Sequence, residues 1–245
     1  MQINEQAFKA ELSWVFKENR MAQLLNAEKS EKFLRLTERM LSENEKYNLT
    51  AIKEPDKIIL NHYADSAALT SILPKGASII DVGCGAGFPS LPLAIVREDL
   101  KILAIDSTAK RIDYVNKTAE MLGLNNINAA VMRAEDGGKL PEYREKFDFA
   151  TARAVSEMRI LAELCFPFIR VGGYMLAMKG KNAEFELSGA KRAIAILGGT
   201  DAKIKDVHLV GKEQSLTHPI ISVKKITKTP MQYPRVYSQI SKKPL

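Results

Sequence analysis

The sequence predicts an α/β protein, in which an N-terminal helical extension precedes a doubly wound, mostly parallel sheet. Three observations support this class: helical periodicity within residues 1–72, short apolar segments that alternate with amphipathic helical segments from residue 73 onward, and a glycine-rich loop after the first apolar segment. Such alternation is typical of a parallel sheet with helices on both faces. We therefore expect an N-terminal helical region, 1–72, and a sheet domain, 73–245, that ends in a basic C-terminal segment.

The N-terminal region has two helical patterns. Ser30 is a suitable N-cap for a helix whose apolar side chains recur at spacings of three, four and seven. These core-facing residues are Phe33, Leu34, Leu36, Met40 and Leu41. Pro55 suits the first position of a second helix, and Ile58, Ile59 and Tyr63 follow on one face.

The remaining chain predicts seven strands. Five alternate with helices and are expected at Ser78–Val82, Lys101–Ile105, Ile127–Met132, Phe147–Ala152 and Tyr174–Met178. The helices are expected at Pro89–Val96, Thr108–Leu122, Glu157–Arg170 and Ala183–Leu197. Two more strands, Lys205–Val210 and Ile220–Ile226, have no long helix between them, so we expect an antiparallel pair at the sheet edge.

The composition is that of a soluble globular protein. Hydrophobic residues make up 46% and charged residues 27% of the 245 positions. No apolar run approaches the roughly 18 residues of a membrane span, and no signal-peptide core follows the N-terminus. Cys84 and Cys165 do not form a secretory disulfide framework, so a cytoplasmic location is expected. The three histidines lack metal-ligand spacing, so no metal site is expected.

The net charge of +7 is concentrated at the C-terminus. Residues 201–245 carry nine Lys or Arg and only three Asp or Glu. A polyanion such as RNA is one partner for such a segment. A solvated basic tail is the other interpretation, and charge alone does not separate the two.

The most informative segment is a glycine loop. A buried strand ends in Asp81, and glycines follow at 83, 85 and 87 before a helix begins near Pro89. Glycine lets the chain turn sharply and lets a ligand approach the backbone, and open parallel sheets bind ligands at the carboxyl ends of their strands. The spacing G-x-G-x-G differs from the dinucleotide pattern G-x-G-x-x-G, and the chain has no ATP phosphate loop. A tight strand–helix turn would also explain the glycines.

Polar residues follow the next strands at the same expected edge. The second strand ends in Asp106, whose carboxylate can accept hydrogen bonds from two ribose hydroxyls. The third ends in Arg133-Ala134-Glu135, the fourth in Arg153 and the fifth in Lys179. Each acidic group alone would fit a surface helix cap, and Lys179 would fit a solvated strand end. Their shared edge instead favours a binding site.

These residues resemble the bacterial small-subunit ribosomal RNA methyltransferase G family, also called glucose-inhibited division protein B. The segment Asp81–Gly87 is similar to the first motif of class I S-adenosylmethionine methyltransferases. The other matching stretches are Asn48–Ile52, Gly87–Pro92, Asp106–Arg111, Arg133–Glu135, Phe147-Asp148 with Arg153-Ala154, Lys179-Gly180, Tyr233–Arg235 and Lys243–Leu245. The resemblance runs from about residue 45 to the end.

The resemblance implies a methyltransferase that uses S-adenosylmethionine and modifies N7 of one guanine in 16S rRNA. It implies cofactor contacts at Gly83, Phe88, Asp106, Ser107, Thr108, Ala134, Glu135 and Arg153, to which the loop adds Gly85 and Gly87. Two positions depart from the family pattern. Asn61 replaces the arginine that opens the family's Arg-His-x-x-Asp-Ser-Leu stretch, which puts an RNA-contact role of this segment in doubt, and Ser90 replaces a frequent glycine.

The chemistry expected of guanine N7 is simple. N7 has a free lone pair and no proton, so its attack on the methyl group needs no general base, only positioning. Arg153, at a strand tip, is the residue expected to orient the reacting groups. Cytosine C5 chemistry would need a cysteine nucleophile. Cys165 lies in an apolar helical stretch, however, and Cys84 lies inside the glycine loop.

RNA contacts are expected from Lys110, Arg111, Lys179, Arg235 and Lys243. The expected partner is 16S rRNA or the small ribosomal subunit, and the chain is expected to act as a monomer. Three alternatives remain open. They are a methyltransferase for a protein or small molecule, a non-catalytic RNA-binding protein that retains the fold, and, less favoured by the glycine spacing, a nicotinamide dehydrogenase.

Overall fold

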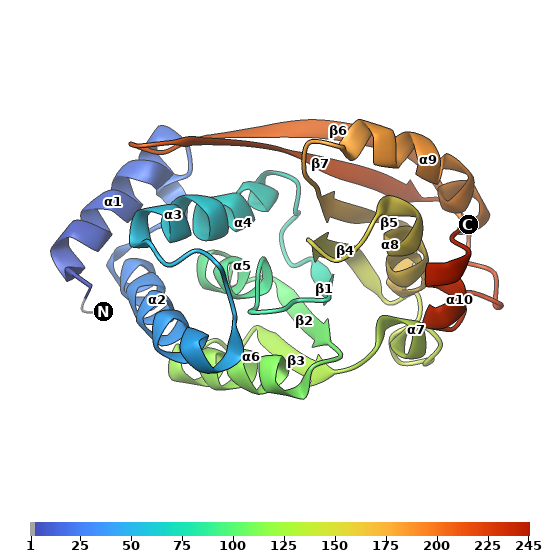
Figure 1. Ribbon diagram of the computed structural model, residues 1–245, viewed down its shortest axis with the longest axis horizontal. Coiled ribbons are helices and arrows are strands. Elements are labelled where there is room, and N and C mark those ends of the chain that lie inside the picture. The colour runs from blue at the N-terminus through green and yellow to red at the C-terminus, as the bar shows by residue number, and fades with distance from the viewer. Residues whose placement is uncertain (1–2) are drawn as a thin grey trace.

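The computed structural model describes residues 3–245, which form a seven-stranded sheet between two layers of helices (Figure 1). The strands are β1 (Ser78–Val82), β2 (Lys101–Asp106), β3 (Ile127–Val131), β4 (Phe147–Arg153), β5 (Ile169–Met178), β6 (Gly199–Val210) and β7 (Ser215–Lys225). Their order is β3-β2-β1-β4-β5-β7-β6. The first five pair in parallel, whereas β7 is antiparallel to β5 and to β6. The predicted mostly parallel sheet with an antiparallel edge is confirmed.

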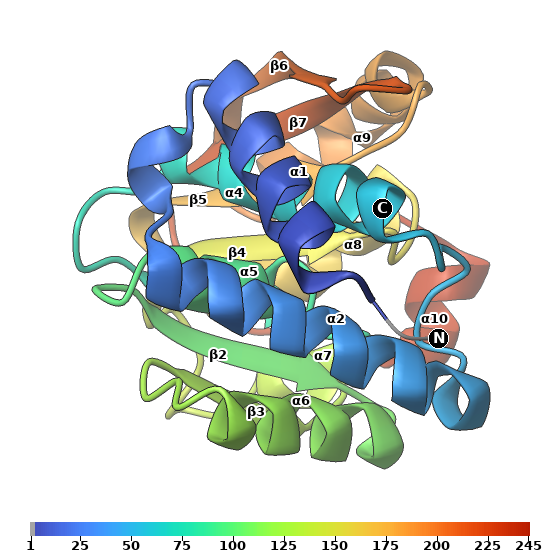
Figure 2. The same ribbon diagram turned by 90° about the vertical axis from the view of Figure 1, so that its left-hand side faces the viewer.

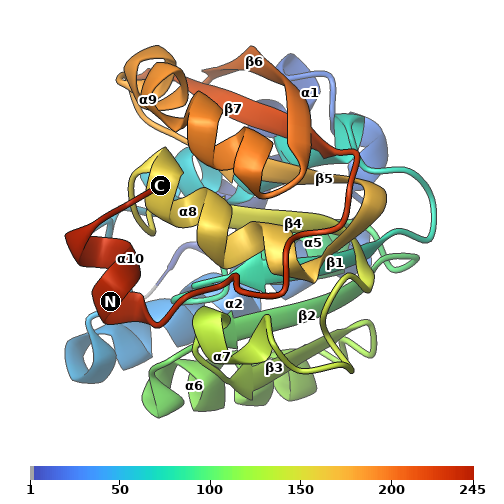
Figure 3. The same ribbon diagram turned by 90° about the vertical axis from the view of Figure 1, so that its right-hand side faces the viewer.

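The helices divide between the two faces of the sheet. The N-terminal ones are α1 (Glu5–Glu18), η1 (Ala22–Leu24), α2 (Ala27–Tyr47), α3 (Pro55–Ile58), η2 (Ile59–Ala64), α4 (Asp65–Ala67) and η3 (Ala68–Ser71). Later ones are α5 (Ser90–Val96), α6 (Ala109–Met121), α7 (Ala134–Gly137), α8 (Met158–Cys165), η4 (Phe166–Phe168), α9 (Ala183–Ile196) and α10 (Tyr237–Lys242). Figure 2 shows α1, α2 and α6 on one side, and Figure 3 shows α8, α9 and α10 on the other. No helix within residues 3–245 is long and apolar enough to span a bilayer.

Alternating side chains of the strands build two cores. Ile79 faces the core shared with the N-terminal helices, and its neighbour Ile80 faces the core shared with α8 and α9. Both side chains are fully buried. This alternation is the period of two that strand geometry imposes. The first core joins Phe8, Leu12 and Phe33 of the N-terminal region to strand residues, so the helical region completes one face of the sheet.

Helix α2 has a different N-cap from the predicted one, whereas α3 begins as predicted. The side chain of Asn26 caps α2 by accepting a hydrogen bond from the Lys29 amide at 2.8 Å. The prediction of Ser30 as the cap is wrong, because Ser30 lies in the first turn and its hydroxyl donates to the Asn26 carbonyl at 2.9 Å. Asn and Ser are comparable caps, so sequence alone does not choose between them. Pro55 does occupy the first turn of α3, as predicted.

The helix predicted at Glu157–Arg170 is shorter than expected. It ends at Cys165, and the 3-10 turn η4 holds Pro167. Proline has no N–H and clashes with the carbonyl four residues earlier, which stops an α-helix. The chain then enters β5 at Ile169, five residues before the predicted strand at Tyr174–Met178.

Ionic contacts fix the chain beyond β7. The side chain of Lys225 is completely buried, and its Nζ donates to Glu145 Oε1 at 2.8 Å and to the Phe166 carbonyl at 2.9 Å. The same Glu145 oxygen accepts the Thr229 amide at 2.9 Å. Burial lowers the pKa of Lys225 to about 8, an effect that the neighbouring Glu145 opposes. A basic residue of the C-terminal segment therefore serves the fold.

The Glu145–Lys225 pair generates a stability prediction. Glu145→Gln leaves the buried Lys225 ammonium without its counter-ion and should lower the free energy of unfolding by about 3 kcal/mol. Urea unfolding at neutral pH measures this change, and Glu142→Gln, which alters an exposed carboxylate on the same loop, is the matched control. The double variant Glu145→Gln/Lys225→Met should be more stable than Glu145→Gln alone, because it removes the unpaired charge. Additive losses would contradict the pairing.

Candidate functional site

The glycine loop after β1 turns sharply and is hydrogen-bonded to the end of β2. The amides of Gly83 and Cys84 both donate to the Ile105 carbonyl, at 2.8 and 3.0 Å. Gly83 has a φ of +73°, and a Cβ at this position would lie 2.8 Å from Cγ2 of Val155. Only glycine meets both the conformational and the steric requirement. Because Gly83 has no side chain, its backbone is accessible to a ligand at the carboxyl ends of the strands.

Asp106 connects this loop to the next one. Its Oδ2 accepts the Gly85 amide at 3.1 Å, and its Oδ1 accepts the Thr108 amide at 2.8 Å. Arg111 Nη1 lies 3.4 Å from Oδ2. The carboxylate is only 6% exposed, so hydrogen bonds replace most of its lost hydration. Asp106 thereby fixes both loops that surround the strand ends.

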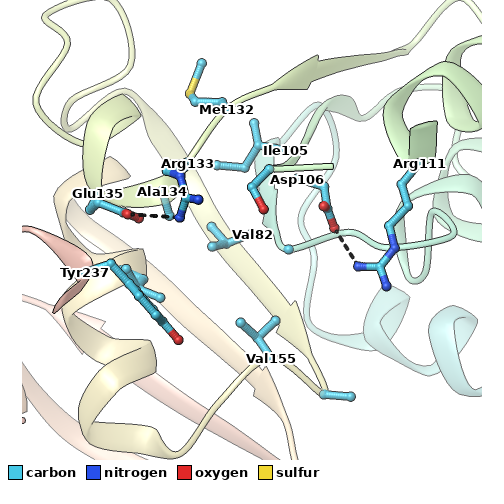
Figure 4. Close-up of a pocket in the computed structure, with 14 residues that line it drawn as sticks. Val82, Ile105, Asp106, Arg111, Met132, Arg133, Ala134, Glu135, Val155 and Tyr237 are labelled. Atoms are coloured by element: carbon cyan, nitrogen blue, oxygen red, sulfur yellow. Dashed lines mark hydrogen bonds and ion pairs between the residues drawn. The ribbon is translucent and has the colours of Figure 1, made fainter. Parts of the chain in front are cut away.

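A cavity of about 380 Å³, here called the loop cavity, lies at the carboxyl ends of β1, β2 and β3 (Figure 4). Five predicted cofactor-contact residues line it: Gly83, Asp106, Ser107, Ala134 and Glu135. Arg111, predicted to contact RNA, lines it as well. Asp106 and Glu135 thus present two carboxylates to one space, and Arg133 lies 3.7 Å from Glu135. Such a space suits a ligand with hydroxyl and amino groups.

The other predicted cofactor-contact residues lie outside the walls of the loop cavity. Gly85 and Gly87 shape the loop, and Thr108 precedes α6 and donates its amide to Asp106. Phe88 is 5% exposed, and its ring stacks against His62 at a centroid distance of 4.5 Å. Arg153 lies next to this stack, with its guanidinium carbon 5.2 Å from the Phe88 ring centroid.

One turn of the N-terminal helices holds Arg153. Nη1 donates to the Asn61 carbonyl at 3.0 Å and to Asp65 Oδ2 at 3.2 Å. Nη2 lies 3.3 Å from Nδ1 of His62. Because a guanidinium only donates, His62 accepts at Nδ1 and presents an Nε2 proton to the Thr50 hydroxyl at 2.9 Å. Asn61 and His62 belong to η2, a π-helical segment, a conformation that is frequent at functional sites, and Asp65 begins α4.

Burial sets the ionisation of the groups around Arg153. Burial, together with the positive charge of Arg153, lowers the pKa of His62 to about 3, so the ring is neutral. Burial raises the pKa of Asp65, against the effects of His218 and Arg153. It also raises the pKa of Asp81 to about 6, although Asp81 accepts hydrogen bonds from Ser90 at 2.5 Å and from Thr151 at 3.2 Å.

A second cavity of about 250 Å³, here called the rim cavity, lies at the carboxyl ends of β4 and β5. Arg153, Lys179 and His218 line it, and so does Ala154, which also lines the loop cavity. The two cavities therefore share a wall. Of the predicted site residues, Arg153 and Lys179 line the rim cavity.

The predicted RNA-contact residues differ in their freedom to bind. Lys110 and Lys243 are exposed, and 45% of the Arg111 side chain is accessible. Lys179 is 10% exposed, pairs with Glu186 at 2.6 Å and donates to the Ser156 carbonyl. Arg235 pairs with the fully buried Glu163 at 2.6 Å, so its guanidinium anchors the C-terminal segment. This pairing favours a structural role for Arg235.

The cysteines have no access to a ligand. Cys84 and Cys165 are both buried, and burial raises the pKa of each thiol well above its ordinary value. Neither side chain lines the loop cavity or the rim cavity. Within residues 3–245, no cluster of three or more His, Cys, Asp or Glu side chains is arranged to hold a metal ion.

Several residues of these cavities were not among the predicted site residues, including Asp65, Glu186 and His218 of the rim cavity and Val155 and Tyr237 of the loop cavity. Asp65 belongs to the Asn61–Ala67 stretch, which the resemblance singled out without assigning a role. His218 contacts Asp65 from β7, and Tyr237 of α10 and Val155 line the loop cavity. No sequence signal indicates His218 or Tyr237, because the fold brings them from distant segments, whereas Val155 lies two residues after Arg153.

The chain matches the profile of the family described as rRNA small subunit methyltransferase G over residues 29–217. It is 42% identical to the ribosomal RNA small subunit methyltransferase G of Clostridium perfringens strain 13, over 90% of this chain and 92% of that protein. The protein of the same name from Desulfitobacterium hafniense is 41% identical, over 90% of this chain and 91% of its own length.

Solved structures share the fold at low sequence identity. A SAM-dependent O-methyltransferase from Thermotoga maritima superposes with a TM-score of 0.51 and 15% identity, covering 78% of this chain and 72% of that one. TYW2 from M. jannaschii, solved in complex with AdoMet, gives 0.52 and 15%, covering 66% and 75%. These neighbours identify the fold class.

The neutral His62 beside Arg153 generates a pH prediction. Since its pKa is about 3 in the folded chain and 6.5 ordinarily, only the unfolded chain binds this proton between those values. The free energy of unfolding should therefore fall as the pH falls below 6.5, by about 2 kcal/mol between pH 7 and pH 5.

His62→Gln should remove this part of the pH dependence, as measured by urea unfolding at the two pH values. His208→Gln, which replaces an exposed histidine, should keep it. An unchanged pH dependence in His62→Gln would show that the ring binds its proton equally well in the folded and unfolded chains.

Proposed function

Because the chain belongs to the rRNA small subunit methyltransferase G family, we propose that it transfers a methyl group from S-adenosylmethionine to N7 of a guanine in 16S rRNA. The observation that carries this proposal is the loop cavity. A glycine loop and two carboxylates, Asp106 and Glu135, converge there at the strand ends where parallel sheets bind ligands. The small ribosomal subunit in the cytoplasm is the proposed setting, with the protein acting as a monomer.

The residues of the loop cavity suit this cofactor. Asp106 can accept hydrogen bonds from two ribose hydroxyls while it keeps its bonds to the loop amides. Glu135 can accept from an amino group, and the bare backbone of Gly83 leaves room for the amino-acid portion. When bound, the cofactor supplies a methyl group on a cationic sulfur, which is already electrophilic.

The contribution of the protein to this reaction is to position the methyl donor and the guanine. Guanine N7 carries no proton, so no side chain has to act as a general base. Orientation of the reacting groups can lower the barrier by about 7–11 kcal/mol. Arg153, fixed by Asn61, His62 and Asp65 beside the wall that separates the two cavities, is the proposed orienting residue. The buried thiols of Cys84 and Cys165 argue against a covalent cysteine mechanism.

Lys110, Arg111 and Lys243 are the proposed contacts for RNA phosphates, because their charges remain accessible. Lys110 and Arg111 belong to the first turn of α6, next to Asp106. This arrangement places positive charge at the entrance of the loop cavity, where a polyanionic substrate would approach.

Asp106→Ala should weaken the binding of S-adenosylmethionine roughly 10- to 150-fold, since hydrogen bonds to a charged acceptor contribute about 1.5–3 kcal/mol. Isothermal titration calorimetry measures the affinity. The control Asp113→Ala removes an exposed carboxylate from α6 and should bind normally. Equal affinities for both variants would exclude Asp106 as the ribose ligand.

The test of function is transfer of a tritiated methyl group to small ribosomal subunits that lack the modification, followed by mapping of the labelled base. Arg153→Ala should lower turnover about 100-fold through loss of orientation. Arg159→Ala, a change on α8 at a side chain that is 41% accessible, should retain activity. Label on a base other than guanine, or on protein, would refute the proposal.

A further inference from the structure

The rim cavity adjoins the loop cavity and lies outside the space in which the glycine loop, Asp106 and Glu135 converge. Ala154 lines both cavities, and Arg153 lines only the second. A group seated in the rim cavity would thus meet a ligand of the loop cavity at Ala154. The substrate of a methyl transfer needs such a place, because the acceptor atom must lie next to the methyl group.

The charges of the rim cavity balance. Two carboxylates, Asp65 and Glu186, face two cations, Arg153 and Lys179, and the four groups form ion pairs of 3.2 and 2.6 Å. A phosphate would meet the carboxylates as well as the cations. A neutral ligand that presents both donors and acceptors fits this lining better, and a nucleobase is such a ligand.

Several polar atoms of the cavity have hydrogen-bonding capacity to spare. Oε2 of Glu186 accepts the Met158 amide at 3.0 Å and lies 2.6 Å from Lys179 Nζ. Within the described residues, Oε1 of Glu186 has no hydrogen-bond partner, and neither has the buried Nδ1 of His218. Lys179 has three N–H donors and uses two of them, on Glu186 and on the Ser156 carbonyl, so one donor remains. The cavity thus has a hydrogen-bond acceptor on Glu186 next to a donor on Lys179.

Guanine matches this arrangement in one orientation. When N7 faces the methyl donor, O6 lies on the same edge and the N1 proton and N2 amino group point away. A carboxylate that faces N1 and N2 can then accept from both groups, and an ammonium can donate to O6. Adenine presents no N1 proton and no O6, so it would leave both protein groups unpaired, which a desolvated site rejects strongly.

We propose that the rim cavity receives the target guanine, that Glu186 accepts hydrogen bonds from its N1 and N2 groups, and that Lys179 donates to O6. This inference rests on the proposed guanine-N7 methylation. Enzymes that modify a base take it out of its stack into such a pocket and read its Watson–Crick edge. Glu186 and Lys179 are then specificity-determining residues, distinct from the ligands of the cofactor.

The test compares subunits whose 16S rRNA carries guanosine or inosine at the modified position. Inosine lacks only the N2 amino group and keeps N1–H, O6 and N7. Wild-type protein should show a kcat/KM for inosine roughly 10- to 150-fold lower than for guanosine. Glu186→Gln weakens the N1 contact with both substrates and the N2 contact with guanosine alone. Its kcat/KM should therefore fall further with guanosine than with inosine, so that the guanosine-to-inosine ratio approaches one.

Two further variants separate recognition from folding. Glu184→Gln removes an exposed carboxylate from the same helix and should keep the wild-type ratio. Lys179→Met should lower the rates of both substrates by the same factor, because both carry O6. Unchanged affinity of Glu186→Gln for S-adenosylmethionine reports an intact fold, and Gln can still accept the Met158 amide.

Failure of the rim-cavity assignment and failure of the proposed guanine-N7 methylation give different results. A wild-type ratio in Glu186→Gln, with normal guanosine methylation by the wild-type protein, overturns the rim-cavity assignment alone. If wild-type protein methylates no guanine N7, the proposed function fails and the inference fails with it.

Discussion

The attachment of Arg153 to residues 61–65 is the contact on which the geometry of the strand ends depends. The guanidinium comes from the last residue of β4, and its partners Asn61, His62 and Asp65 come from the N-terminal helices. A partly buried cation needs such partners to offset its lost hydration. The contact therefore ties the helical extension to the sheet at the point where the two cavities meet.

The neutrality of His62 is a consequence of the same contact. A protonated imidazole beside Arg153 would add a second positive charge in a buried space, so the ring remains an acceptor for the guanidinium. Its stacking on Phe88 extends the contact to the loop after β1. One aromatic pair and one cation thus align the glycine loop, β4 and the N-terminal helices.

The basic C-terminal segment shows how charge is divided between fold and surface. Lys225 is buried against Glu145, and Arg235 pairs with the buried Glu163. Arg144 donates to the carbonyls of Thr229 and Tyr233, at 2.8 and 2.9 Å. These bonds hold the segment that leads to α10, which contributes Tyr237 to the loop cavity. Lys243, by contrast, is exposed at the surface.

The sequence by itself determined the seven strands, the glycine loop and the acidic residues at the strand ends. These features follow from local rules: the apolar period of a strand, the conformational freedom of glycine, and the common edge at which parallel strands end. The ends of helices were predicted less accurately. Asn26 and Ser30 are comparable caps for α2, and the prediction extended α8 past Pro167, which lies in the 3-10 turn after it.

Only the tertiary structure decided which distant groups meet. It brings Asp65, Arg153 and His218 together from three separate segments, and it buries Lys225, which appeared in the sequence as one more basic residue. Ion pairing and desolvation depend on distances in space, and a local pattern of residues does not encode those distances. The loop cavity was therefore largely predictable from sequence, whereas the rim cavity and the attachment of Arg153 were not.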